Sequence, residues 1–403
     1  MTMTKAMLRD VPADQLRGRR VLLRADLNVP LEGERIIDET RIRETLPTLR
    51  LLREAGARVI VLSHLGRPKG KPDPRCTLKP LVNRLCTLLG GTVRFHPGLT
   101  EPEARAAVDS LQDGEVLVLE NTRFHPGDEK NDPALADALA GMADLFVNDA
   151  FGAAHRAHAS TTGVARSVQA RGGRAVAGLL MEEELDYLGR VLHSPERPFV
   201  AILGGAKISG KIEVIRSLLP RVDRLLVGGA MANTCFRALG LETGASLVEE
   251  DRIDVARATL QEAGDRLVLP VDCVVADRIE DEPVTRIVPR DSVQPGDRIL
   301  DIGTATRALF AKLIGEARTV FWNGPMGIFE HPPFHQGTVA VARSVADATE
   351  RGALTVVGGG DSAAAAEAAG VTARLSHVST GGGASLEFLA GDPLPGVEAL
   401  SDR

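Results

Sequence analysis

Short apolar runs typical of buried β-strands alternate with helix-like patterns from one end of the chain to the other. Residues 21–23, 59–62 and 356–357 are examples of such runs, and each is followed at once by a charged or polar residue or by glycine. The helix-like stretches are residues 46–55, 78–89, 133–141, 211–219, 251–263, 337–349 and 362–370. This alternation is typical of βα units, in which each helix carries the chain back to begin another parallel strand. We therefore predict an α/β fold with parallel sheets.

The length of 403 residues determines how many domains to expect. One hydrophobic core rarely serves more than about 250–300 residues, so we predict two Rossmann-like three-layer domains. Residues 179–193 carry Met181, Leu185, Leu188 and Leu192 at helical spacing, and we interpret them as a helix joining the domains. An ordinary helix within one domain is the alternative. The expected boundaries are 1–172 for the N-terminal domain, 173–194 for the linker and helix, 195–386 for the C-terminal domain and 387–403 for a proline-broken final segment.

Composition and charge exclude several classes of function. Apolar residues make up 44% of the chain and charged residues 25%, and the net charge of −6 argues against nucleic acid or an acidic membrane as the main partner. No apolar run approaches the roughly 18 residues of a membrane span, and the first residues lack a signal-peptide core, so we expect a cytoplasmic protein. The four cysteines share no metal-ligand spacing and are expected to be reduced structural thiols.

Charged and amide side chains follow four apolar runs in the first 160 residues, and one more stands where a helix is expected to begin. They are Asp26, Asn28, Arg41, His64, Arg67, Arg123 and Arg156. Ligands of open α/β sheets bind outside the carboxyl ends of the strands, so cations at these positions should converge on one small site. We predict that this half holds a small, highly charged anion. For any single residue, a structural hydrogen bond is the alternative. The charges of the loop 124–132, such as Glu129 and Lys130, are expected to be solvated.

Glycine replaces charge after the strand-like runs of the second half. The runs lead directly into residues 204–207, 228–231, 323–327 and 358–361. Glycine lets the backbone approach a ligand and aim N–H groups at phosphate oxygens. Residues 205–211 nearly form a P-loop, but Ile212 stands where that motif needs Ser or Thr. We expect Lys207 and Lys211 on one face of the first helical turn, facing a polyphosphate, and solvated lysines are the alternative.

Two further glycine clusters suit phosphate. Residues 358–363 match the dinucleotide pattern G-x-G-x-x-A, but no acidic residue for a ribose stands about 20 positions further on. Asp361 could hold Mg2+ directly or through water, or cap the helix that follows. Gly381 to Gly383 are expected to open a helix whose unpaired N–H groups suit a transferring phosphoryl group, and a flexible loop without ligand is the alternative.

Seven segments are long and rare enough to compare with known motifs. They are residues 24–30 (RADLNVP), 62–68 (LSHLGRP), 119–124 (LENTRF), 150–158 (AFGAAHRAH), 204–211 (GGAKISGK), 322–327 (WNGPMG) and 358–361 (GGGD). Together, in order from about residue 20 to 390, they resemble the phosphoglycerate kinase family. The resemblance implies reversible phosphoryl transfer from 1,3-bisphosphoglycerate to MgADP, which gives 3-phosphoglycerate and MgATP in glycolysis.

The resemblance also implies roles for particular residues. The three-carbon acid would bind the seven residues of the first half named above. The nucleotide would meet Gly205, Lys207, Lys211, Gly303, Asn323, Glu330, Gly358, Gly359, Gly360, Asp361 and Ser362, with Mg2+ at Asp361. We hypothesise that the catalytic residues are Arg41, Lys207, Gly382 and Gly383. The final segment would return to the N-terminal domain, and we expect a monomer.

The chemistry can be argued without a general base, because the carboxylate of 3-phosphoglycerate is already ionised at neutral pH. We hypothesise that Arg41 and Lys207, from opposite domains, neutralise the moving phosphoryl group, with hinge closure about residues 179–193 bringing the substrates together.

The chain departs from the usual family pattern at Thr304-Ala305, where Pro-Glu or similar is common, and at Ala230, which replaces a frequent glycine. We expect these departures to affect nucleotide affinity rather than chemistry. An NAD-dependent dehydrogenase and a non-catalytic phosphometabolite-binding protein are the alternative functions.

Overall fold

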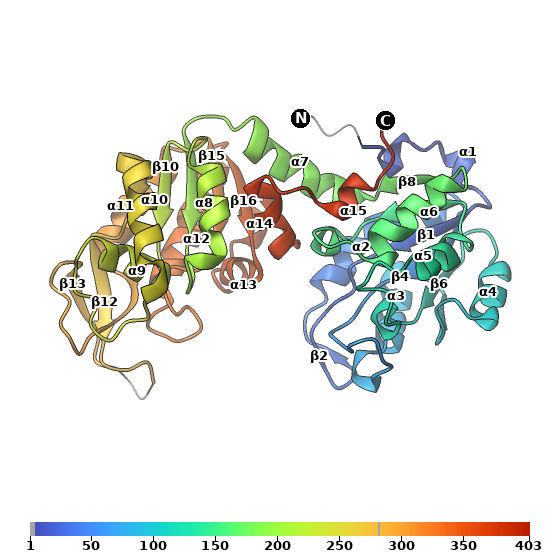
Figure 1. Ribbon diagram of the computed structural model, residues 1–403, viewed down its shortest axis with the longest axis horizontal. Coiled ribbons are helices and arrows are strands. Elements are labelled where there is room, and N and C mark those ends of the chain that lie inside the picture. Colours follow the sequence, from blue (N-terminus) through green and yellow to red (C-terminus); the bar gives the residue numbers. More distant parts are fainter. Residues whose placement is uncertain (1–4, 281–282) are drawn as a thin grey trace. The chain divides into compact units, whose positions relative to one another are not determined.

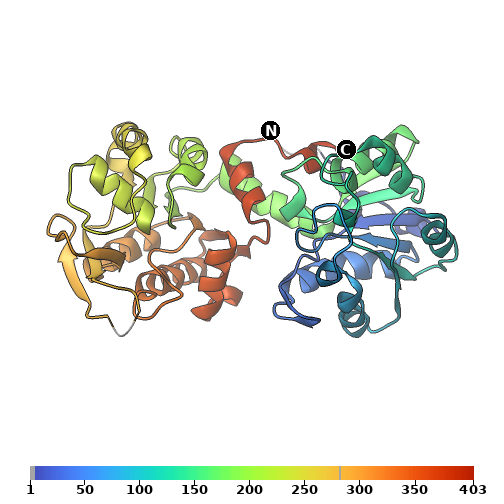
Figure 2. The ribbon, with the colours of Figure 1, turned by 60° about the horizontal axis from the view of Figure 1, so that its bottom comes forward.

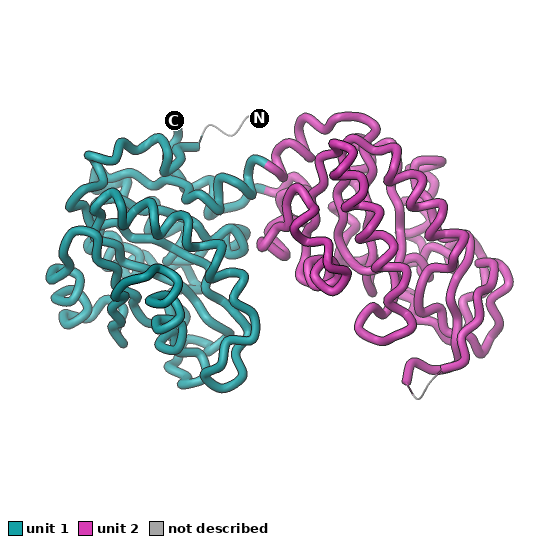
Figure 3. The backbone as a smooth tube through the Cα atoms, turned by 180° about the vertical axis from the view of Figure 1, so that it is seen from behind, with its two compact units in different colours: residues 1–186, 393–403 teal, residues 187–392 magenta. Residues whose placement is uncertain are grey.

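The protein is described by a computed structural model over residues 5–280 and 283–403 (Figure 1). The chain divides into two compact units, one of residues 1–186 with 393–403 and the other of residues 187–392 (Figure 3). Each unit is built on one six-stranded sheet in which every pair of neighbouring strands is parallel. The predicted α/β class, with parallel sheets in two Rossmann-like units, is therefore confirmed.

The first unit has the strand order β5-β6-β4-β1-β7-β8. Its strands are β1 (Arg20–Arg24), β4 (Arg58–Leu62), β5 (Val93–His96), β6 (Val116–Leu119), β7 (Leu145–Asn148) and β8 (Arg174–Ala177). Its longer helices are α2 (Thr40–Glu54), α3 (Lys79–Leu89), α4 (Pro102–Asp109), α5 (Pro133–Ala140) and α6 (Val164–Ala170). The four runs that were expected to end in polar side chains are β6, β4, β1 and β7, which are consecutive neighbours in the sheet.

Alternate residues of these strands face opposite sides of the sheet, and both sets are buried. Leu23 and Val61 pack in a core cluster with Leu49 of α2 and Leu85 of α3. Phe146, on the opposite face of β7, is also fully buried. Strands covered on both faces read as continuous apolar runs, which is why the sequence showed runs here rather than alternation. Replacing one of these core leucines with alanine typically costs about 2–5 kcal/mol of unfolding free energy.

The second unit has the strand order β11-β10-β9-β15-β16-β17. Its strands are β9 (Phe199–Leu203), β10 (Arg224–Val227), β11 (Leu267–Val268), β15 (Thr319–Asn323), β16 (Leu354–Gly358) and β17 (His377–Val378). Its helices include α8 (Ile212–Leu218), α9 (Ala230–Ala238), α10 (Ile253–Ala263), α11 (Thr304–Gly315), α12 (Gln336–Glu350), α13 (Gly360–Ala368) and α14 (Gly383–Ala390). The glycine-ended runs are β10, β9, β15 and β16, again consecutive neighbours. Helices flank the sheet in each unit (Figure 2).

Several local expectations were wrong. An antiparallel sheet of β12 (Asp272–Ala276), β13 (Arg286–Pro289) and β14 (Arg298–Ile302) was not foreseen. The apolar residues before the last glycine cluster form a 3-10 helix (Thr372–Arg374) followed by the two-residue β17. Small elements complete the fold: α1 (Ala13–Leu16), the hairpin of β2 (Leu31–Glu32) and β3 (Arg35–Ile36), and α15 (Pro395–Glu398).

Helix α7 (Leu179–His193) spans the boundary between the units, which falls between Asp186 and Tyr187. Its expected apolar stripe is buried throughout, from Met181 to Leu192. The final residues 393–403 belong to the first unit, where Gly396 N donates to Ala154 O at 2.9 Å and Ser401 N donates to Ala175 O at 2.8 Å. Within the described residues, the helices are all too short or too polar to cross a bilayer.

Candidate active site

The predicted anion-binding residues of the first unit lie at the carboxyl ends of its four central strands. Asp26 and Asn28 follow β1, and His64 and Arg67 follow β4. Arg123 lies in a short 3-10 helix (Thr122–Phe124) after β6, Arg156 follows β7, and Arg41 lies in the first turn of α2. Because parallel strands end at the same edge of a sheet, their loops are neighbours even though the residues are up to 130 positions apart in sequence.

Hydrogen bonds join several of these residues. Arg41 Nη1 donates to Asp26 Oδ2 at 2.8 Å, so this guanidinium is held by a buried carboxylate. Asn28 Oδ1 accepts from Gly66 N at 2.8 Å, and Arg123 Nη1 donates to Gly66 O at 2.9 Å. The loop after β4 is thus fixed from both sides. Arg67 and Arg156 are exposed and remain at the solvent side of the cluster.

His64 differs from the expectation that it would be one of the cations. The fully buried Arg24, which was not predicted as a site residue, places Nη2 3.0 Å from His64 Nδ1. A guanidinium has only donors, so Nδ1 accepts and the proton of the neutral ring is on Nε2. Burial, together with the charges of Arg24, Arg123 and Arg41, lowers the pKa of His64 well below its usual value. His64 is therefore a neutral hydrogen-bond donor.

A second correction concerns Asp128, one of the loop charges that were expected to be solvated. Glu129 and Lys130 are exposed, but Asp128 is fully buried, and its Oδ1 accepts from Ser160 N at 3.0 Å. Its charge opposes the lowering of the pKa values of Arg24 and Arg123 that burial causes. Asp128 therefore compensates part of the positive charge beneath the anion site. Its neighbours in sequence gave no sign of this.

In the second unit, Lys211 proves to be internal. Its Nζ donates to Gly204 O at 2.7 Å, to Asn323 O at 3.0 Å and to Asn323 Oδ1 at 2.5 Å. Burial lowers its pKa to about 8, partly opposed by the charge of Asp361. The three ammonium donors are all used, so Lys211 ties the end of β9 to the end of β15.

Lys207 and Lys211 do not share a helical face, contrary to the expectation. Residues 209–211 form a 3-10 helix, and α8 begins only at Ile212, so Lys207 lies in the turn before the helix. Its side chain is exposed. Of the two lysines, Lys207 is the one whose ammonium group is available to a ligand. The turn closely approaches the loop after β15, since a Cβ at Gly204 would lie 2.1 Å from Pro325 O.

Ser362 and Asn323 also make internal contacts. Ser362 is buried in α13 and its Oγ accepts from Gly324 N at 2.6 Å, while Asn323 Nδ2 donates to Gly358 O at 2.7 Å. These bonds hold the loops after β15 and β16 together. Asp361 is exposed in the first turn of α13, and Gly359 precedes it with a φ of +92°. Gly358 is buried beneath Phe321, at the end of β16.

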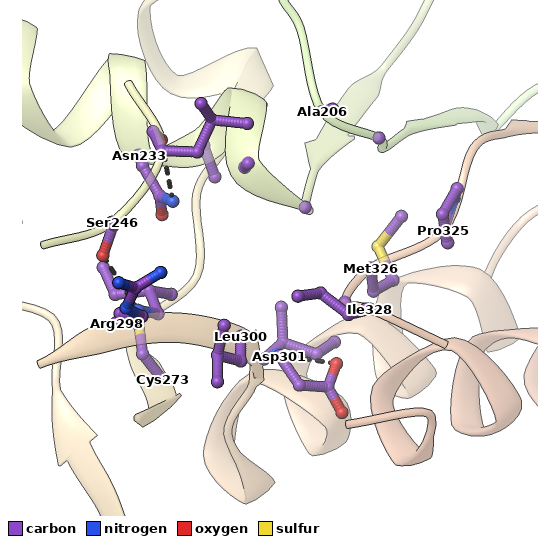
Figure 4. A pocket seen from close by; sticks show the side chains of 18 of the residues that line it. Ala206, Asn233, Ser246, Cys273, Arg298, Leu300, Asp301, Pro325, Met326 and Ile328 are labelled. Carbon is purple, nitrogen blue, oxygen red and sulfur yellow. Dashed lines mark hydrogen bonds between the residues drawn. The ribbon is translucent and has the colours of Figure 1, made fainter. Parts of the chain in front are cut away.

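Beside these loops lies a pocket of about 380 Å³, whose walls are largely apolar (Figure 4). It brings together three of the predicted nucleotide residues, Gly205, Glu330 and Asp361. Residues that the sequence did not single out make up most of the lining, among them Asn233, Ser246, Leu247, Leu300, Asp301 and Ile328. They come from α9, the loop after α9, β14 and the loop after β15, and their spacing in the chain forms no motif.

The pocket also locates the two departures from the family pattern. Ala230 lines it, at the start of α9. Thr304 and Ala305 lie outside the lining, at the start of α11, where Ala305 N donates to Asp272 Oδ2 at 2.9 Å. Gly303 precedes them, packed against the Asp272 side chain. Of the two departures, Ala230 is the one that alters the pocket surface.

The last glycine cluster opens α14. Gly382 has a φ of +53°, and Gly383 is the first residue of the helix and exposed. Ser379 Oγ and Ser385 Oγ are 2.6 Å apart and tie the loop to the helix. The first N–H groups of a helix lack partners within it, so this end can receive an anion.

Comparison with known proteins identifies the family of the chain. Residues 8–392 match the family model described as phosphoglycerate kinase. The chain belongs to the phosphoglycerate kinase family. It is 56% identical over 401 residues to the phosphoglycerate kinase of Rubrobacter xylanophilus, covering 100% of this chain and 99% of that one. The phosphoglycerate kinase of Chloroflexus aggregans is 54% identical over 406 residues, covering 99% and 100%.

Solved structures show the same relationship in three dimensions. The phosphoglycerate kinase of Coxiella burnetii superposes with a TM-score of 0.88 at 39% identity, over 98% of both chains. That of Pyrococcus horikoshii gives 0.85 at 33% identity, again over 98% of both. The similarity thus covers both units and not only one nucleotide-binding domain. The dehydrogenase interpretation of residues 358–363 is not favoured.

Proposed function

We propose that this member of the family transfers a phosphoryl group reversibly from 1,3-bisphosphoglycerate to MgADP, giving 3-phosphoglycerate and MgATP in glycolysis. The observation that carries the proposal is the pairing of two groups of residues. One unit gathers guanidinium groups at the carboxyl ends of its strands, and the other places an apolar pocket beside glycine turns and Lys207. We further propose that the enzyme works as a monomer in the cytoplasm.

In the first unit, Arg41, Arg67, Arg123 and Arg156 would bind the anionic groups of the three-carbon acid, and His64 would donate through Nε2. Asp26 orients Arg41 through the 2.8 Å contact, and Asn28 holds the Gly66 amide. No group in this cluster needs to take a proton, because the nucleophile is an ionised carboxylate. The task of the site is to orient the acid and to neutralise its charge.

In the second unit, the base and ribose would occupy the pocket, with Glu330 at its exposed rim. Lys207 would approach the phosphates, while Lys211, Asn323, Gly303 and Ser362 shape the loops around them. The exposed Asp361 fits a single carboxylate ligand of Mg2+, whose remaining ligands in nucleotide sites are usually phosphate oxygens and water. The bound ion would supply neutralisation of phosphate charge.

The transferring group would lie between Arg41, Lys207 and the α14 N-terminus at Gly382 and Gly383. A loose phosphoryl transition state spreads charge over its oxygens, so donors fixed in advance are the main source of catalysis. For the two substrates to meet, the units would close by hinge motion about α7. Closure would also exclude water and protect ATP from hydrolysis.

The test is a coupled assay with 3-phosphoglycerate and MgATP, in which glyceraldehyde-phosphate dehydrogenase consumes the product and NADH loss is followed. We expect NADH loss that requires 3-phosphoglycerate and disappears in Lys207→Ala. Lys312→Ala, which removes an exposed lysine from α11, is the matched control and should retain full activity. Ligand binding without turnover would instead indicate a non-catalytic phosphometabolite-binding protein.

A further inference from the structure

Glu249 reaches from a loop after α9 to the turn that carries Lys207. Its Oε2 accepts from Ile208 N at 2.5 Å and from Ser209 N at 3.1 Å, and its Oε1 accepts from Ser209 Oγ at 2.5 Å. One carboxylate thus receives three hydrogen bonds from the two residues that follow Lys207. Bonds of this kind to an ionised acceptor are about twice as strong as those between neutral groups.

The other side of Glu249 is anchored to the nucleotide unit. Its backbone N donates at 3.1 Å to Oγ1 of Thr234, which is fully buried in α9. Two residues earlier, Leu247 O accepts from Asn233 Nδ2 of the same helix at 3.2 Å. Asn233 and Leu247 line the pocket. The segment from Leu247 to Glu249 therefore connects the pocket wall directly to the carboxylate that accepts the hydrogen bonds of the Lys207 turn.

Glycines flank the turn, so its backbone conformation depends on contacts such as those of Glu249. Gly205 has a φ of +104°, and at Gly210 no atom lies within 4 Å of the position a Cβ would take. Both positions leave the backbone freer than other residues would. The exposed Lys207 side chain, with its four-carbon stem, cannot fix its own position. Lys211 secures the far end of the segment, so Glu249 is what fixes the middle.

The charge state of Glu249 agrees with this arrangement. Burial favours its protonated form, but hydrogen bonds from Ser209 and Ile208 and the charge of Lys207 together keep its pKa below the usual value. Glu249 also occupies the amides of Ile208 and Ser209, so these two N–H groups are not free for phosphate, as a P-loop would have them. The ligand must then be held by Lys207 and the glycines around it.

We propose that Glu249 is a positioning residue for phosphoryl transfer, which holds the Lys207 turn and couples it to the wall of the nucleotide pocket. The proposal rests on the proposed function, because it assumes that Lys207 meets the transferring group. Glu249 itself is not among the residues that line the pocket.

The test compares Glu249→Ala and Glu249→Gln with Glu250→Gln, whose exposed side chain is next in the chain. A misplacement of about 1 Å can cost on the order of 10²-fold in rate, so we expect kcat of Glu249→Ala to fall by roughly that factor. The KM for 3-phosphoglycerate should stay within about twofold, because its site is in the other unit. Glu249→Gln keeps one carbonyl acceptor and should be intermediate, and Glu250→Gln should match the parent.

Hydrogen exchange provides a readout that does not need turnover. In Glu249→Ala the amides of Ile208 and Ser209 should exchange at least about tenfold faster, while those of Glu250→Gln should not change. If Glu249→Ala does not fold, Glu249→Gln serves for the same comparison. A parent protein without kinase activity would reject the proposed function. Unchanged exchange, or a kcat within threefold of the parent, would reject the role of Glu249 alone.

Discussion

Arg41 is the residue of the first unit that we expect to act on the transferring group. Its guanidinium is partly exposed and oriented by Asp26, so replacing it removes charge without emptying the core. We expect Arg41→Ala to lower kcat by about 10³ or more, the usual worth of an arginine at a phosphoryl transition state. Arg43→Ala on the same helix removes an exposed guanidinium paired with Glu39 and should change kcat less than twofold in the coupled assay. A loss within threefold for Arg41→Ala would contradict the proposed catalytic role.

His64 leads to a prediction about protonation. The groups that face it, Arg24, Arg41, Arg123 and His158, are cations or are neutral at pH 7, and burial acts in the same direction. We expect its ¹⁵N spectrum to show a bare Nδ1 and a protonated Nε2 from pH 8 to below pH 6, with His64→Gln used to assign the signals. In the unfolded chain the ring takes a proton near pH 6.5, so its contribution to stability is lost as pH falls below that value. A titration midpoint at or above 6.5 in the folded protein would show that Arg24 does not hold the neutral form.

At this scale, the sequence predicted which side chains follow the central strands of the first unit, but not the balance of buried charge beneath them. Arg24 and Asp128 are both fully buried, although each stands beside residues at the site edge. Whether such a charge is buried depends on Ser160 and the loop around it, which approach from far along the chain. Local pattern carries no information about that packing.

At the scale of elements, the start of α7 is held by Asp149, which follows β7. Its Oδ1 accepts from Leu180 N at 2.9 Å and from Met181 N at 3.2 Å, and burial raises its pKa to about 6. When a carboxyl has a higher pKa in the folded protein than in the unfolded chain, the folded protein loses stability as pH rises through the folded-state pKa. The variant Asp149→Asn has no carboxyl to ionise at this position. We therefore expect its unfolding free energy minus that of the parent to increase by on the order of 2 kcal/mol from pH 4 to pH 8.

Urea unfolding at a series of pH values measures this difference. Asp109→Asn, on the exposed surface of α4, is the matched control for replacing a carboxyl group with an amide. The Asn side chain keeps one oxygen for the α7 amides, so the variant should still fold. A difference that stayed flat, or that fell as pH rose, would mean that Asp149 is ionised in the folded protein across the whole range.

Some of the helices and strands could be predicted from the sequence pattern alone, and others could not. The parallel strands were predictable because both faces of each are covered, which leaves continuous apolar runs such as Val59 to Leu62. The start of α8 was not predictable, because Glu249, forty residues away, binds the amides of Ile208 and Ser209. The antiparallel sheet of β12, β13 and β14 was missed for a similar reason. Its edge strand β13 is mostly exposed and carries no continuous apolar run.

For the molecule as a whole, each proposed substrate site lies within one unit. The small-acid site uses residues 26–156, and the nucleotide pocket uses residues 205–361. Each ligand should therefore bind without the other and stabilise its own unit, by about 2.7 kcal/mol at a concentration of 100 times its Kd. In-line transfer, however, requires reacting atoms within about 3–3.5 Å. We therefore expect each unit to bind its own ligand, whereas turnover should need both units.

This separation predicts that closure needs both ligands. Solution X-ray scattering should give an unchanged radius of gyration with 3-phosphoglycerate alone or MgADP alone, and a smaller one with both, a mixture that cannot react. Lys207→Ala and Arg41→Ala should each weaken the compaction, because these two side chains would bridge the ligands, whereas Lys312→Ala should not. Full compaction with a single ligand would place the closing contacts within one substrate. Turnover without any compaction would remove hinge closure from the mechanism, since the two sites would then have to meet in the open form.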